Sequence, residues 1–329
     1  MSLIRQTYYA LKPFLPDPVR MFLRRAWASR QLKIHGDVWP VNRAASVPPE
    51  NWAGWPDGKR FALVLTHDVE GQRGVDRCQM LAGMEAAAGF RSSFNFIPEG
   101  GYETPAELRL WLQKNDFEVG VHDLRHDGKL YWSRKAFRSH AQAINRYLKD
   151  WGAVGFRSGF MLRNLEWLSD IEMLYDSSTF DTDPFEPQPD GAQTIFPFWV
   201  SSRRDGHDVS GDSRRLTGNA RPAGAGYVEL PYTLAQDSTL FVVLQERTDR
   251  IWKQKLDWIA ERGGMALMNT HPDYMSFGGD VQRDEFKAEL YINFLEYVQK
   301  KYAGEFWHVL PREVAGFIGT RSKALINGC

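Results

Sequence analysis

The sequence predicts an α/β fold in which about eight parallel strands close into a barrel. Along most of the 329 residues, short apolar runs alternate with amphipathic helical patterns. Repeated β–α units of this kind are typical of a parallel sheet, and about eight of them favour closure into a barrel. Polar side chains also follow several of the apolar runs, at the strand ends where barrel proteins carry their chemistry.

The first units define both patterns. The run at 60–66 is almost entirely apolar, which predicts a strand buried on both faces. The helical pattern over 104–115 should begin with Thr104 as its N-cap and Pro105 at its first helical position.

The other elements follow from the same two periodicities. Apolar runs predict further strands at 91–97, 117–122, 154–158, 174–178, 227–231, 239–244, 264–271 and 306–311. Further helices are predicted at 78–90, 133–151, 250–263 and 284–302, with one near 164–173 and a short one at the end of the chain. Strands and helices therefore alternate, as a barrel of β–α units requires.

Composition and charge exclude several classes of protein. The chain has 41 basic and 41 acidic residues, so no overall field attracts nucleic acid. No apolar run reaches the length of a membrane span, and the first residues lack the continuous apolar core of a signal peptide. Cys78 and Cys329 give no disulfide framework. We therefore expect a cytoplasmic protein.

Residues 1–55 are expected to form a basic, amphipathic N-terminal arm, and residues 56–329 the barrel domain. Within residues 1–35, seven Lys or Arg residues are interleaved with apolar and aromatic side chains, against Asp17 alone. Such a segment can lie on an anionic membrane surface, which would make the protein a peripheral membrane protein. The alternative is an arm that packs its apolar stripe on the barrel while its basic side chains face water.

Five strand ends carry residues that can bind metal or move protons. They are Thr66, His67, Asp68 and Glu70 after the first strand, His122 and His126 after the third, and then Arg157, Asp176 and His271. Because the carboxyl ends of barrel strands meet at one face, we expect these side chains to form one site.

The acids and the histidines each have a second interpretation. Asp68 and Glu70 would point the same way on an extended backbone, where one could hold a cation and the other accept a proton. They could instead cap the helix that begins after Gln72. The spacing of His122 and His126 suits a metal-binding pair, but two hydrogen-bonded surface histidines could have the same spacing.

Five segments, in order, carry a resemblance to a known family. "LTHDVEG", "GVHDLRHDG", "GFRSG", "YDSSTFD" and "MNTHP" resemble the motifs of the polysaccharide deacetylases, carbohydrate esterase family 4, over about residues 60–275. The resemblance implies a deformed (β/α) barrel of about seven or eight parallel strands and metal-dependent removal of acetyl groups from N-acetylated sugars. The first motif departs from the family's two adjacent aspartates, because Val69 separates Asp68 from Glu70.

The resemblance also implies a metal site and a base. Glu70, His122 and His126 would hold one divalent metal ion, and two histidines with a carboxylate favour Zn²⁺. Asp68 would be the catalytic base, with Arg157 keeping its carboxylate ionised. The reverse assignment, with Asp68 on the metal, stays open.

The same resemblance makes His271 the acid that protonates the leaving amine, oriented by Asp176 or Asp181. For Arg157 and Asp176 there is another interpretation, in which they form a buried ion pair that supports the barrel.

Segments near the expected mouth of the barrel could determine specificity. Residues 179–200 are rich in Pro, acids and aromatics, and long irregular loops at a barrel mouth often bind substrate. Residues 201–226 are expected to form a surface loop, or alternatively a lid. Candidate sugar platforms, each of which could equally be a packing residue, are Trp132, Phe185, Trp199 and Tyr274.

These patterns lead to three hypotheses about function. The first is a metal-dependent hydrolase that removes an N-acetyl group from a sugar of a glycan or glycan precursor, with an N-acetylated sugar or oligosaccharide as its partner. The second is hydrolysis of a non-sugar amide or imide at the same site. The third, suggested by the altered first motif, is a catalytically weak carbohydrate-binding protein.

Overall fold

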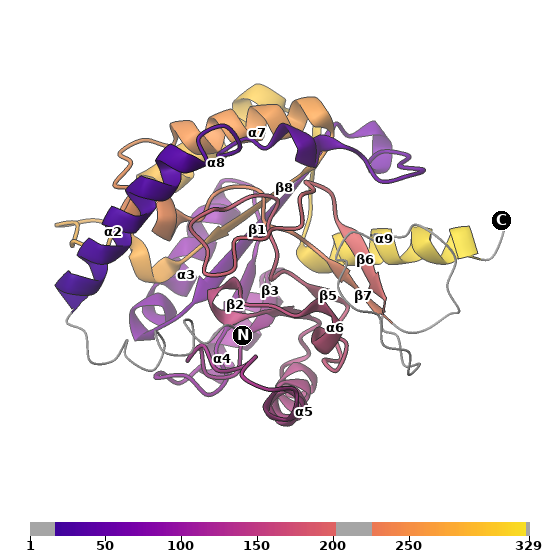
Figure 1. The fold of residues 1–329 in the computed structure, drawn as a ribbon, viewed down its shortest axis with the longest axis horizontal. Coiled ribbons are helices and arrows are strands. Elements are labelled where there is room, and N and C mark those ends of the chain that lie inside the picture. Colours follow the sequence, from indigo (N-terminus) through magenta and orange to yellow (C-terminus); the bar gives the residue numbers. More distant parts are fainter. Residues whose placement is uncertain (1–16, 202–225, 327–329) are drawn as a thin grey trace.

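The computed structural model describes residues 17–201 and 226–326, and Figure 1 shows the fold. Its centre is β1 (Phe61–Val69), in which all nine residues are buried. β8 (Met265–Thr270) runs parallel along one edge of β1, while β11 (Phe306–His308) and β2 (Ser93–Phe96) share the other edge. The apolar run that begins β1 suits this central place, because a parallel strand is covered on both faces.

From β2 the sheet continues through parallel neighbours and curls round. The order is β2, β3 (Glu118–His122), β4 (Gly155–Arg157), β5 (Tyr175–Asp176) and β7 (Gly226–Glu229), with β6 (Phe198–Ser201) antiparallel at the edge. A parallel bridge between Leu234 and Met268 then connects the segment after β7 to β8. The predicted deformed (β/α) barrel of about seven or eight parallel strands is confirmed.

Helices cover the sheet from outside. They are α3 (Gln72–Ala87), α4 (Ala106–Lys114), α5 (Arg134–Trp151), α6 (Leu165–Leu168), α7 (Arg250–Arg262), α8 (Glu289–Tyr302) and α9 (Pro311–Ile326). In Figure 1, α4 and α5 lie on one side of the sheet, and α7 and α8 lie on the opposite side. α5 begins where the sequence predicts, because the Ser133 side chain accepts a hydrogen bond from the Ala136 backbone N–H.

One helix precedes the barrel. α2 (Asp17–Ile34) is fixed to the rest of the chain by Arg25, whose guanidinium donates to the backbone carbonyl of Val242 at 3.0 Å. Within residues 17–201 and 226–326, no helix is long and apolar enough to cross a membrane. The short elements are η2 (Arg43–Ser46), η3 (Pro56–Gly58), η4 (Gly159–Met161), η6 (Pro272–Tyr274), β9 (Met275–Ser276) and β10 (Phe286–Lys287).

Three predictions about local structure are wrong. The run at 239–244 is not a strand but part of a π-helix, η5 (Ser238–Val243), because a short run that is apolar throughout has no period that separates a buried helix from a buried strand. Pro105, not Thr104, occupies the N-cap position of α4, and it makes no side-chain cap hydrogen bond. The last helix, α9, has 16 residues and is not short.

A buried carboxyl group, Glu118, begins β3 at the end of the sheet opposite His122. The Tyr175 hydroxyl donates to it at 2.7 Å and the Arg312 backbone N–H donates at 3.1 Å. Burial raises the pKa of Glu118 to about 7, because these hydrogen bonds offset only part of the cost of burying a charge. The folded state therefore favours the neutral form more strongly than the unfolded chain does.

We expect this group to lower stability as pH rises. In the unfolded chain Glu118 ionises near pH 4.5, whereas in the folded chain it ionises near pH 7. Its contribution to the free energy of unfolding is fully present below pH 4.5 and falls by roughly 3 kcal/mol by pH 7. Urea unfolding of the wild type and Glu118→Gln at pH 5 and pH 8 measures this, because glutamine cannot ionise. If the free energy of unfolding changes equally for both proteins between pH 5 and pH 8, Glu118 does not make this contribution.

Candidate active site

The carboxyl ends of the parallel strands meet at one face of the barrel. His122 at the end of β3 is in register with Arg157 at the end of β4, and Thr66 on β1 is in register with Asn269 on β8. Contacts between side chains at this face bring together Asp68, Glu70, His122, His126, Arg157 and His271. Six of the nine residues expected at the site therefore lie in one cluster.

Asp68 is fully buried and held by three hydrogen bonds. Its Oδ1 accepts from Asn95 Nδ2 at 2.9 Å and from Arg157 Nη1 at 3.0 Å, and its Oδ2 accepts from Asn269 Nδ2 at 2.8 Å. Gly120 on β3 leaves the space that the Asn95 side chain needs, because a Cβ there would overlap the amide oxygen. The carboxylate is thus fixed from three directions.

The charge of Arg157 determines the ionisation of Asp68. The guanidinium is itself held in place, because Nε donates to the Ser177 carbonyl and Nη2 to the Ser177 hydroxyl, both at 2.7 Å. Burial would raise the pKa of Asp68, but Arg157, His122 and His271 outweigh it and hold the pKa well below its usual range. Asp68 is therefore a buried, ionised carboxylate.

Glu70, His122 and His126 form a group that could hold a metal ion. One ligand atom from each lies within 4.8 Å of the others. Glu70 Oε1 is 3.1 Å from His126 Nε2 and 3.8 Å from His122 Nε2. Two imidazoles and one carboxylate at this spacing are a donor set that suits zinc and leaves further coordination positions open.

The orientation of the histidines fits a metal ion. His122 Nδ1 lies 3.1 Å from the Arg157 carbonyl oxygen, to which its N–H donates, and this contact turns Nε2 toward Glu70. Among the described residues, the buried Nε2 atoms of His122 and His126 have no hydrogen-bond partner. Buried polar atoms are rarely left without partners, and two that face one carboxylate are accounted for by a shared cation.

The loop that carries His126 has an uncommon backbone. Asp123 and His126 have φ values of 58° and 53°, in the left-handed region that side chains other than glycine rarely adopt. Asp123 supports the loop by accepting from the backbone N–H groups of Leu124 and Gly159. A Cβ at Gly159 would lie 2.7 Å from the His126 ring, so glycine is needed there. Strain of this kind persists where surrounding contacts over-determine the geometry.

Glu70 is positioned from the opposite side by the segment after β8. Its backbone N–H donates to Asp273 Oδ2 at 2.9 Å, and its Oε2 accepts from the Tyr274 hydroxyl at 3.0 Å. The alternative in which Asp68 and Glu70 cap α3 is wrong. Gly71 is the N-cap and makes no side-chain cap bond, and the Gly74 N–H in the first turn donates to Asp273.

His271, at the end of β8, is paired with a residue that the sequence did not indicate. Its Nδ1 lies 2.6 Å from Asp237 Oδ1, and its backbone N–H donates to Asp237 Oδ2 at 2.7 Å. Burial would lower the pKa of His271, but the negative charge of Asp237 dominates and raises it to about 10. The ring is therefore a cation at neutral pH, with Nε2 3.8 Å from Glu70 Oε1.

The prediction that Asp176 or Asp181 orients His271 is wrong. Asp176 accepts from the backbone N–H and the hydroxyl of Ser178. Asp181 pairs with Lys255 at 2.5 Å. Asp176 ends β5 as predicted, but its carboxylate is hydrogen-bonded to Ser178, two residues further along the chain. The alternation of apolar and polar residues along a strand does not reveal a contact of this kind. The predicted ion pair of Arg157 with Asp176 is likewise wrong, because Arg157 pairs with Asp68.

His67 and Thr66 are not among the residues that could hold a metal ion, although the Thr66 hydroxyl accepts from Arg157 Nη1 at 2.9 Å. His67 lies between Thr270 Oγ1 at 2.7 Å and Glu85 Oε1 at 2.9 Å, and is fully buried. The Thr66 hydroxyl donates to the Met268 carbonyl. These contacts tie β1 to β8 and α3.

Three polar residues of the site are not predicted by the sequence patterns. Asn95, Asn269 and Asp237 contact Asp68 or His271 directly. Asn269 could have been found, because it lies two residues before His271 on the same strand. Asn95 is a polar residue in a short buried strand, which is also a usable signal. Nothing near Asp237 resembles a motif.

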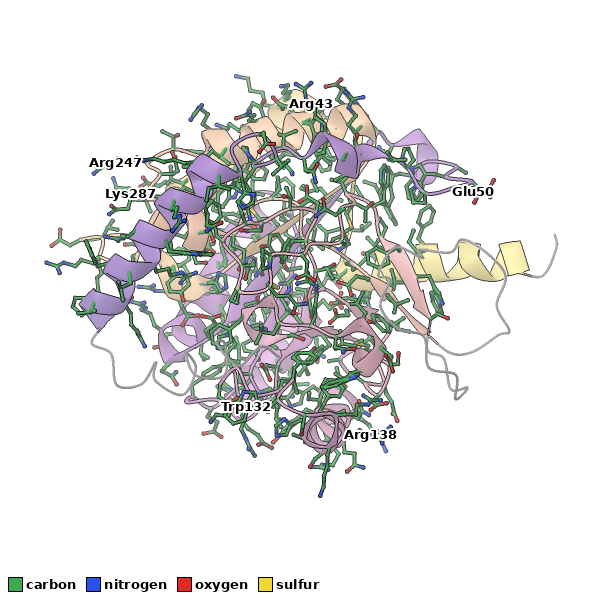
Figure 2. All side chains as sticks on the ribbon, in the orientation of Figure 1. Arg43, Glu50, Trp132, Arg138, Arg247 and Lys287 are labelled. Atoms are coloured by element: carbon green, nitrogen blue, oxygen red, sulfur yellow. The ribbon has the colours of Figure 1, made fainter. Side chains whose placement is uncertain are left out.

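The candidate sugar platforms have different surroundings. Tyr274 lies beside the site, with its ring centroid 5.2 Å from that of His271. Phe185 is buried against Trp39 and cannot stack on a sugar. Trp132 is 40% exposed and lies at the edge of the molecule in Figure 2. Apart from its two end residues, the loop predicted at 201–226 lies outside the described residues, as do residues 1–16.

Comparison of the fold with solved structures finds similar barrels. A protein described as a polysaccharide deacetylase from Mycobacterium smegmatis has a TM-score of 0.58 and 17% identity, covering 81% of this chain and 93% of its own. The allantoinase PuuE has a TM-score of 0.55 and 16% identity, covering 84% and 94%. No family model and no curated protein matches the sequence. The chain therefore has the same deformed (β/α) barrel fold as these two proteins.

Proposed function

We propose that the protein is a metal-dependent hydrolase that removes an N-acetyl group from a sugar of a glycan or glycan precursor. The observation that carries the proposal is the arrangement at the barrel face. An ionised acid, Asp68, and a cationic imidazole, His271, flank the group formed by Glu70, His122 and His126. Amide hydrolysis needs a base for water, an acid for the leaving nitrogen and an electrophile between them.

Glu70, His122 and His126 would hold the ion, and the donor set favours Zn²⁺. A bound divalent ion supplies Lewis acidity, because it lowers the pKa of water and polarises a carbonyl group. Glu70 is the better candidate for the carboxylate ligand. Its Oε1 faces both imidazoles, whereas both oxygens of Asp68 already accept hydrogen bonds.

Asp68 would accept the proton of the attacking water. Its three hydrogen-bond donors hold the carboxylate in place, and its Oδ2 is 3.9 Å from His122 Nε2, beside the proposed metal position. His271 would give a proton from Nε2 to the departing nitrogen, because Asp237 fixes Nδ1 and stabilises the cation. Arg157 does not meet the substrate in this scheme; it positions Asp68.

Two single substitutions test this division of roles. Asp68→Asn should keep the metal and lose turnover by about a hundredfold or more, because an amide cannot act as the base. Glu70→Gln should weaken metal binding. Inductively coupled plasma mass spectrometry measures the metal content, and acetate release from N-acetylglucosamine oligomers measures the turnover. Melting temperatures check that both variants fold. If Asp68→Asn empties the site and Glu70→Gln does not, the roles are reversed.

A second candidate is hydrolysis of a non-sugar amide or imide. The allantoinase with this fold has a TM-score close to that of the deacetylase, so the barrel itself fits both chemistries. Acetate release from N-acetylhexosamine compounds, compared with hydrolysis of a set of cyclic and linear non-sugar amides, discriminates the two. A catalytically weak carbohydrate-binding protein would bind sugar and release no product in either assay.

A further inference from the structure

The outer face of α2 exposes large apolar side chains. The exposed fractions are 70% for Phe22, 53% for Leu23, 45% for Val19, 41% for Trp27 and 55% for Ile34. On a helix of 3.6 residues per turn these positions fall on one half of the surface. A soluble surface helix normally shows its polar side to water, so this exposure is unusual.

The opposite, inner face of α2 is the one packed on the protein. Ala28 is fully buried, and Arg25 donates to the Val242 carbonyl at 3.0 Å. α2 is therefore attached to the protein, and detachment does not explain why the apolar side chains of its outer face are exposed. They are held outward by contacts on the other side of the helix.

The same helix is strongly basic. Its 18 residues include five Arg or Lys residues and one acidic residue, Asp17 at the first position. Arg30 and Lys33 are exposed and lie on the outer face among the apolar side chains. An exposed helix face that combines aromatic and aliphatic side chains with Lys and Arg is typical of helices that lie in the interface of an anionic bilayer.

α2 is connected to the candidate active site through η5. Val242, which accepts from Arg25, is in η5, and the residue that caps η5 is Asp237, the partner of His271. One short element therefore separates the helix from the proposed acid.

We propose that the outer face of α2, defined by Val19, Phe22, Leu23, Trp27, Arg30, Lys33 and Ile34, docks on the surface of a bilayer that contains anionic phospholipid. The apolar side chains would enter the interface, while the basic side chains contact lipid phosphates. A second copy of the chain fits this face less well, because a symmetric contact would bring two basic helices together. If the proposed function holds, docking would bring the active site to glycan substrates at the membrane surface; this consequence rests on that function.

Sedimentation of the full chain with lipid vesicles tests the proposal. Binding is expected with equal parts of phosphatidylcholine and phosphatidylglycerol, and much less with phosphatidylcholine alone or at high salt. Phe22→Ser with Leu23→Ser should reduce the partition coefficient by about tenfold or more. The matched control is Leu110→Ser with Met80→Ser, which removes two apolar side chains that are 65% and 54% exposed on other helices. This control should bind like the wild type.

Three outcomes would overturn the proposal. One is binding by the Phe22 and Leu23 variant that equals wild-type binding. Another is an equal loss in the Leu110 and Met80 control. The third is a dimer in sedimentation velocity that the Phe22 and Leu23 variant converts to a monomer, which would make a second copy the occupant.

The proposed function is tested separately. Acetate release from a soluble oligosaccharide should be the same in the Phe22 and Leu23 variant as in the wild type. A protein that binds vesicles but hydrolyses nothing would refute the proposed function and leave the docking surface intact.

Discussion

Replacing both His122 and His126 with alanine is expected to abolish retention of a divalent metal ion. Their Nε2 atoms are buried, face Glu70 and, among the described residues, have no hydrogen-bond partner. Removing both leaves one carboxylate, which does not hold zinc in a site of this kind. Turnover should fall to the level of protein stripped of metal. Metal analysis after gel filtration gives the stoichiometry directly.

The fold should survive this double substitution, because within the described part of the chain the only polar contacts that the two rings lose are the hydrogen bond of His122 with the Arg157 carbonyl and those with the Glu70 and Asp68 carboxylates. The matched control is His35→Ala with His140→Ala, two histidines outside the group, which should retain about one ion per chain. Undiminished metal in the His122 and His126 variant would show that the ion binds elsewhere.

His271→Ala should slow amide cleavage by about 100- to 10,000-fold, the usual share of a positioned general acid. The nitrogen of an amide leaves poorly unless it is protonated, and His271 is the buried cation beside the metal group. An acetyl ester of an activated phenol leaves as a stable anion and should lose much less. Metal content should be unchanged, because His271 is not among the three residues that could hold the ion.

Asp237→Asn provides a second variant for the same claim. Asparagine can still contact His271 Nδ1 but carries no charge to stabilise the cation, so the loss should again be larger for amide than for ester. If His271→Ala lowers both activities equally together with the melting temperature, the residue is structural. It would then have no part in the mechanism.

Much of the fold and part of the site could be predicted because strong local patterns determined them. The buried apolar run of β1 fixes the centre of the sheet, and parallel strands bring their carboxyl ends to one face. Asp68 and His122 are the last or nearly the last residues of such strands, so their proximity follows from topology. Glu70 lies one residue beyond β1, at the same face of the barrel as Asp68 and His122.

The rest of the site depends on contacts between distant segments. Asp237 lies 34 residues before His271 and begins a π-helix whose apolar sequence predicted a strand. Nothing in a single sequence pairs these two positions. Asp176 shows the opposite case: it is an acid at a strand end, as predicted, yet Ser178 satisfies it locally. Asn95 offers only the signal of a polar residue in a short buried strand, because a neutral amide adds no charge to the pattern.

The most direct test of the account is acetate release from an N-acetylglucosamine oligomer by protein loaded with Zn²⁺, before and after chelation. We expect acetate to appear together with an equal amount of free amine, to stop when the metal is removed, and to resume when Zn²⁺ is restored. Hydrolysis of a non-sugar amide without acetate from any N-acetylated sugar would contradict the proposed substrate. Acetate release that chelation leaves unchanged would contradict the metal centre itself.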